Sequence, residues 1–230
     1  MSRQSSAETV ERSETAIHGS VRERAILPIL VRIAAGITAI ALLLAAARLP
    51  IWRALFSAPQ YPQGLEIAAY GNKVEGDLDE INELSHYIGM PPFDFVGMPE
   101  MRLWPLVILV GAIAVVLALA TRRRWLRRLS CVTVWLIPVG ALVDVQFRLW
   151  QVGHSLDPMS AIRVAPFTPR VLGPTDLMNF TIVAFPGTSL ILIAVAAALV
   201  TATPVLARRV TRRTGLATDP ERTHATPKAQ

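Results

Sequence analysis

Four long apolar stretches constrain what this 230-residue chain can fold into. A helix needs about 20 apolar residues to cross the hydrocarbon core of a bilayer. The chain is 52% hydrophobic and only 17% charged, which is too apolar for a soluble domain of this length. We therefore expect an all-α membrane protein with four transmembrane helices, at about 25–47, 103–120, 129–150 and 180–207.

Basic residues flank these spans in a pattern that predicts their orientation. Four arginines precede the first span, five lie in the short link after the second, and six basic residues follow the fourth. Loops rich in Lys and Arg stay on the cytoplasmic side, so we expect a bacterial cytoplasmic-membrane protein with both termini inside. The loops at 48–102 and 151–179 then face outward. Because the charge lies beside apolar spans, the expected partner is the lipid bilayer and not nucleic acid, despite a pI near 10.4.

The chain divides into three parts on the same evidence. Residues 1–24 form a polar tail, 25–207 the membrane domain with its outer loops, and 208–230 a basic tail. Both tails have the composition of disordered cytoplasmic segments. Cys131 is the single cysteine, which excludes an intrachain disulfide and a metal cage built of cysteines.

The first outer loop has a pattern of its own. Two short β-like runs, 65–70 and 73–75, flank Gly71-Asn72, which is typical of a β-hairpin. A short helix is expected to follow, starting with Asp77 as its cap and ending at Gly89. We therefore predict a small α+β cap, a hairpin plus a short helix, on the outer side of the four spans.

The polar face of that short helix holds the first candidate site. Asp79, Glu83 and His86 share one face, opposite an apolar face, and Met90 follows the helix end. One interpretation is a metal or proton site made of His86 and Met90, with Glu83 and Asp79 in support. The other is an ordinary amphipathic helix with a solvated face, because a single His with nearby acids is a weak metal signal.

The end of the third span holds the second candidate site. Asp144 and Arg148 lie four residues apart, so they share a helix face and can pair. Ionisable groups within a span are costly and often functional. An ion pair that only orients the helix is the alternative. Beyond the span come His154, Asp157 and Met159, which form either a second group of ligands or a capped helix end.

Taken together, the outer loops offer imidazole and thioether ligands. This set suits copper, since thioether sulfur favours Cu(I), whereas imidazole with carboxylate also suits zinc, iron or manganese. No Cys pair, His-x-His or Met-rich repeat accompanies it, so spacing alone leaves the metal open. We expect the second loop to pack over the first and to bring His86 and His154 together. The ligand candidates are His86, Met90, Met98, Met101, His154, Asp157 and Met159.

Several motifs resemble a little-characterised family of small bacterial membrane proteins. They are Tyr61-Pro62-x-Gly64-Leu65, Gly76-x-x-x-Glu80-Ile81-Asn82-x-Leu84-x-His86-Tyr87-Ile88-Gly89-Met90, Gly153-His154-x-Leu156-Asp157-Pro158, Pro166-Phe167-Thr168-Pro169 and Leu172-Gly173. The similarity covers about 50–186. The family is associated with gene neighbourhoods for nitrous oxide reductase maturation and periplasmic copper handling.

The resemblance implies functional roles for His86, Met90, His154 and Asp157. The chain departs from the family pattern at Ser85, where the family has Asn before the motif histidine. It also implies a non-enzymatic accessory protein that holds copper on the outer side and delivers it to a periplasmic metalloenzyme or partner chaperone. Glu83, Asp157 and Asp144 would then orient the imidazoles as hydrogen-bond acceptors, with Arg148 in support.

Other functions stay open from the sequence. A non-metal structural or assembly subunit of a larger membrane complex fits helices rich in small residues. A membrane enzyme using His86 and Asp157 as general base and orienting group is weaker, because no nucleophile or phosphate-binding motif accompanies them. A channel or transporter is disfavoured by the small number of spans and the lack of an inverted repeat.

Overall fold

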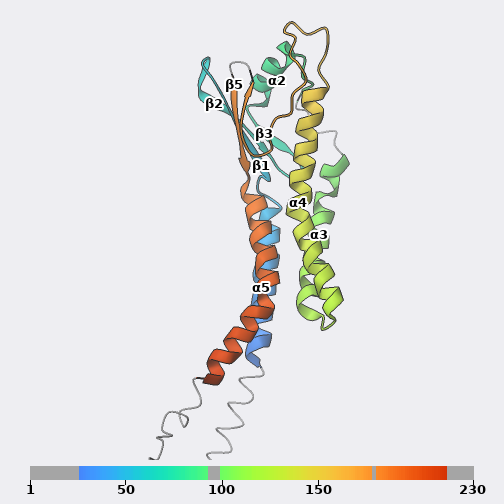
Figure 1. The fold of residues 1–230 in the computed structure, drawn as a ribbon, viewed down its shortest axis with the longest axis vertical. Helices are drawn as coiled ribbons and strands as arrows, with labels where there is room; N and C mark the ends of the chain where they lie inside the picture. The colour runs from blue at the N-terminus through green and yellow to red at the C-terminus, as the bar shows by residue number, and fades with distance from the viewer. Residues whose placement is uncertain (1–25, 93–98, 178–179, 217–230) are drawn as a thin grey trace, which may run out of the picture.

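The structure, a computed structural model, describes residues 26–92, 99–177 and 180–216. Four of its helices are long and apolar enough to cross a membrane, which confirms the prediction of a multi-pass membrane protein. Figure 1 shows them below a β-sheet that stands at one end of the bundle. The four spans are Ile26–Ala46, Met101–Ala120, Arg124–His154 and Thr188–Val210.

The all-α fold class is wrong, because the sheet is too large to be a minor cap. Its five strands are all antiparallel, in the order β3-β2-β1-β5-β4, and the fold is α+β. The strands are β1 (Trp52–Ala58), β2 (Tyr61–Ala69), β3 (Val74–Gly76), β4 (Gly173–Leu177) and β5 (Phe180–Pro186). The helices are α2 (Leu78–Tyr87), α3 (Pro99–Ala120), α4 (Arg124–His154) and α5 (Thr188–Leu216), besides the first span.

The predicted fourth span, 180–207, begins too early. Its first residues form strand β5, although their high mean hydropathy is typical of a membrane span. In the structure Ile182 and Ala184 are buried while Thr181 and Val183 are exposed, the two-residue period of a half-buried strand. The helix begins only at Thr188. At its other end α5 continues beyond 207 to Leu216, and the remaining parts of both predicted tails lie outside the described residues.

The sheet is joined directly to two of the membrane helices. Strand β1 follows the first span and pairs with β5, which leads into α5. At the junction the Gly187 N–H donates to the Ile51 carbonyl at 2.8 Å, and the Ser189 N–H donates to the Pro50 carbonyl at 2.9 Å. A Cβ on Gly187 would lie 2.1 Å from the Pro50 oxygen, so only glycine fits. The strand pair therefore fixes the sheet relative to the bundle.

The predicted hairpin and short helix are both present. Strands β2 and β3 pair from Ile67↔Gly76 to Ala69↔Val74, around the predicted turn. Asp77 is the residue before α2, but its carboxylate does not cap the helix. It accepts a hydrogen bond from the Glu66 N–H at 2.8 Å instead, which ties the helix start to β2.

Two hydrophobic cores follow from this arrangement. One lies between the four membrane helices, and the other lies between the sheet, α2 and the end of α4 nearest the sheet. Ile81 of α2 and Leu149 of α4 belong to this second core, as the apolar face predicted for α2 requires. The fully buried members of the two cores include Leu43, Val115, Val134, Ile193 and Ile67.

Candidate functional site

The loops at 48–102 and 151–179, here called the first and second loops, meet at the end of α2. The Asp157 N–H donates to the Gly89 carbonyl at 2.8 Å, and the Ile162 N–H donates to the Tyr87 carbonyl at 3.0 Å. Gly89 has a positive φ of 73°, and a Cβ there would lie 2.7 Å from the Asp157 oxygen. Glycine at this position therefore ends the helix and also admits the second loop.

A cleft of about 510 Å³ lies at this junction. We call it the His86 cleft. Its walls come from both loops: the end of α2 supplies one imidazole and one thioether, and the second loop supplies a carboxylate and a second thioether. Its lining residues with metal-binding groups are His86, Met90, Asp157 and Met159. The structure thus brings three of the four predicted site residues together, along with Met159.

Asp157 shapes the cleft through the backbone. Its carboxylate accepts the Met159 N–H at 2.8 Å, and its carbonyl accepts the Ser160 N–H at 3.2 Å. This turn carries Met159 back toward α2, where it stays 86% exposed. Asp157 therefore positions Met159 as well as lining the cleft.

His154 lies elsewhere. It is the last residue of α4, and it is not among the residues lining the His86 cleft. Its Nδ1 lies 2.9 Å from the Trp150 carbonyl oxygen, and its ring stacks on the Trp150 ring with centroids 4.8 Å apart. With Nδ1 held by the backbone, Nε2 is the nitrogen left for a ligand. The structure does not bring His154 and His86 to one cavity.

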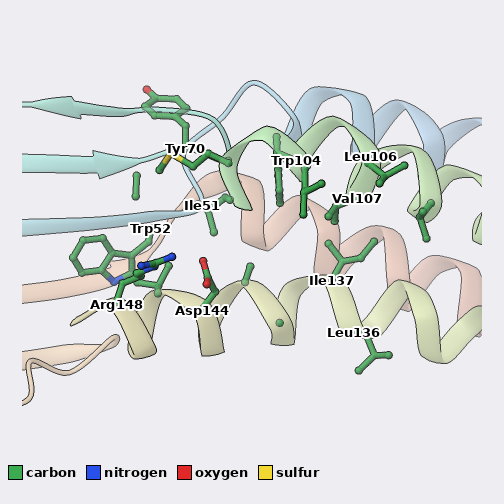
Figure 2. Close-up of a pocket in the computed structure, with 18 of the residues that line it drawn as sticks. Ile51, Trp52, Tyr70, Trp104, Leu106, Val107, Leu136, Ile137, Asp144 and Arg148 are labelled. Carbon is green, nitrogen blue, oxygen red and sulfur yellow. The ribbon is translucent and has the colours of Figure 1, made fainter. Parts of the chain in front are cut away.

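The predicted supporting residues are also distributed differently. Asp79 and Glu83 are exposed on α2 and do not line the His86 cleft. Asp144 and Arg148 line a separate cavity, where Figure 2 shows both side chains rising from the same face of α4. The shared face was predicted. Met101 lines this second cavity too, and Met98 lies outside the described residues.

The second cavity is a feature that sequence reasoning missed. It has a volume of about 510 Å³ and lies between α3, α4 and the end of the sheet nearest the bundle (Figure 2). We call it the interfacial cavity. Its walls are largely apolar apart from Asp144 and Arg148. The two ionisable residues of the third span were the sequence signal for it, but no pattern showed which other elements would enclose them. No ion pair between Asp144 and Arg148 is present among the interactions that the described residues show.

Gln146 is a further structural residue that the sequence did not single out. Its side-chain amide donates to the Pro169 carbonyl at 3.0 Å and accepts the Val171 N–H at 3.0 Å. The Trp52 indole donates to the Val171 carbonyl at 2.7 Å. The Pro-Phe-Thr-Pro segment is thereby held against α4 and β1, and it fixes the path of the second loop from the His86 cleft to β4.

Comparison with protein-family models gives no match for this chain, and comparison with curated proteins gives none either. Within the described ranges, no three His, Cys, Asp or Glu side chains come together as a potential metal site. A site in the His86 cleft would depend on its two methionine sulfurs, and this limits the metals that it suits to soft ions.

Proposed function

We propose that this chain is a membrane-anchored accessory protein that holds Cu(I) transiently in the His86 cleft and delivers it to a metalloenzyme or a partner chaperone. One observation carries the proposal: His86, Met90 and Met159 line a single cleft, although they come from two loops far apart in the sequence. One imidazole and two thioethers form a soft ligand set of the kind that selects Cu(I).

The construction of the cleft suits loading and release. His86 and Met90 are held by the end of α2, which packs on the sheet through Ile81. Met159 stands on a turn and is nearly fully exposed. An incoming protein can therefore replace Met159 as a ligand while the other two still hold the ion. A buried site with four fixed ligands would retain its metal instead.

The resemblance described above supports the same function. Its motif residues His86, Met90 and Asp157 all line the cleft, and Gly89 makes the junction between the loops. We further propose that the protein lies in the bacterial cytoplasmic membrane with both termini inside, following the distribution of basic residues. The cleft then faces the compartment where a periplasmic copper enzyme matures.

Competition for Cu(I) tests the proposal. Full-length protein in detergent would be titrated anaerobically against a chromophoric Cu(I) chelator. We expect His86→Ala, Met90→Leu and Met159→Leu each to weaken Cu(I) binding at least about tenfold, because each removes one ligand atom. Leucine keeps the apolar volume of methionine, so a loss reports on sulfur and not on packing.

Met101→Leu is the matched control, since Met101 lines the interfacial cavity and not the His86 cleft. Its affinity should equal that of the wild type. A His154→Ala variant measures whether that residue contributes at all. Equal Cu(I) affinity in the wild type and the three cleft variants would refute the proposal. Stoichiometric co-purification of a protein partner without copper would then favour an assembly subunit.

A further inference from the structure

The interfacial cavity opens toward the bilayer. Several of its lining residues on α3 and α4 are exposed apolar side chains, so its mouth lies on the surface that lipid covers. Its volume of about 510 Å³ falls within the range of about 300–1,000 Å³ found for small-molecule sites. The exposed apolar residues at its mouth are Leu103, Leu106, Val110 and Leu136.

The outer end of the cavity has a different chemistry. Asp144 and Arg148 enter it from α4, and Figure 2 shows the Arg148 side chain beside Trp52. Arg148 also donates to the Gln151 side chain at 3.0 Å, which orients its guanidinium. Carboxylates and guanidinium groups within a span are costly and mark functional sites. Trp52 adds aromatic surface beside Arg148, and Tyr70 and Trp104 also line the cavity.

We propose that this cavity binds the head of an isoprenoid quinol, with the tail leaving through the apolar mouth. A quinol head is a flat ring with one oxygen on each of two opposite edges. Asp144 and Arg148 are four residues apart on α4, a spacing that places Cβ atoms about 5–6 Å apart. One hydroxyl donates to the Asp144 carboxylate, and the Arg148 guanidinium donates to the other oxygen.

A phospholipid fits the same cavity less well. Asp144 lies one helical turn nearer the middle of the span than Arg148. A phosphate held by the Arg148 guanidinium would lie within about one helical turn of the Asp144 carboxylate, and the two anions repel. A phospholipid would also bring two acyl chains to the mouth, where a quinol brings one tail. Quinol binding in this cavity does not depend on copper binding in the His86 cleft.

Tryptophan fluorescence provides the test. Two of the five tryptophans, Trp52 and Trp104, line the cavity, and quinones quench indole emission on contact. Full-length protein in phosphatidylcholine nanodiscs would be titrated with decylubiquinone, with decylubiquinol and its dimethyl ether as competitors. The quinone can still accept from Arg148, so we expect its quenching to saturate. The quinol should bind at least about tenfold more tightly than the quinone or the ether, because neither of those has a donor for Asp144.

Variants localise the site. A Cβ on Gly140 meets nothing within 4 Å, so Gly140→Phe fills the cavity without an immediate clash, and saturable quenching should disappear. Val139→Phe is the matched control, because Val139 is 53% exposed and does not line the cavity. Asp144→Asn and Arg148→Gln should each weaken quinol binding about tenfold, which is about 1.4 kcal/mol.

Three results would overturn the proposal. The first is quenching that never saturates, and the second is quenching that is the same in Gly140→Phe and in the wild type. The third is native mass spectrometry that shows a phospholipid retained by the wild type and lost from Gly140→Phe. If Gly140→Phe does not fold, Asp144→Asn and Arg148→Gln provide the test. A quinol affinity in both variants equal to that of the wild type would contradict the proposed contacts.

Discussion

Replacing Gly89 with alanine is expected to weaken Cu(I) binding about 100-fold, because mutating the groups that hold metal ligands in place typically costs about 10–100-fold in affinity. The new Cβ would lie 2.7 Å from the Asp157 oxygen and 2.8 Å from the Ser160 Cβ. The second loop must then move away from α2 and take Met159 with it. The positive φ of 73° adds backbone strain. Anaerobic Cu(I) competition measures the effect.

Gly173→Ala is the matched control for Gly89→Ala. Gly173 also has a positive φ, of 93°, but a Cβ there meets nothing within 4 Å. It therefore adds backbone strain without moving the second loop, and its Cu(I) affinity should stay within twofold of the wild type. If both variants lose copper equally, strain in the fold and not the junction of the loops controls binding.

Gly153→Ala is expected to destabilise the protein by about 3 kcal/mol, in the range of the more severe point mutations. The Phe167 N–H donates to the Gly153 carbonyl at 3.2 Å, and a Cβ on Gly153 would lie 2.0 Å from the Phe167 oxygen. The backbone of the second loop at Phe167 must therefore move away from α4. For a chain of this length the loss corresponds to a fall in Tm of about 6–12 °C, measured by thermal unfolding in detergent.

Gly140→Ala serves as the control on the same helix. A Cβ on Gly140 meets nothing within 4 Å, and alanine favours helix over glycine by roughly 1 kcal/mol. Its Tm should equal or exceed that of the wild type. A Gly153→Ala variant as stable as Gly140→Ala would show that the second loop is not fixed to α4 through this contact.

The membrane helices and the hairpin were predictable because each has a strong local signal. Long apolar runs mark the spans, and Gly71-Asn72 between β-like runs marks the turn. Strand β5 was missed because its apolar residues continue directly into the fourth span. A hydropathy average over the whole stretch does not show that the buried Ile182 and Ala184 alternate with exposed residues. Strand β4 is short, and its pairing with β5 is a tertiary contact that no local pattern shows.

The candidate site was also predictable in part from local motifs. His86, Met90 and Asp157 stand in distinct motifs, and the structure brings them to one cleft. His154 has an equally distinct motif, yet α4 continues as a helix to this residue and Nδ1 bonds to the Trp150 carbonyl. A one-turn difference in where a helix ends decides which way a terminal side chain points, and element boundaries are the least certain part of a sequence-based prediction.

X-ray absorption spectroscopy of the Cu(I)-loaded, full-length protein identifies the atoms that bind the ion. Copper in the His86 cleft should have a first shell of two sulfur atoms and one imidazole nitrogen, from Met90, Met159 and His86. The sulfur contribution should halve in Met159→Leu and stay unchanged in Met101→Leu. A first shell of nitrogen and oxygen alone, or a spectrum that changes with His154→Ala but not with Met159→Leu, would contradict copper binding in the His86 cleft.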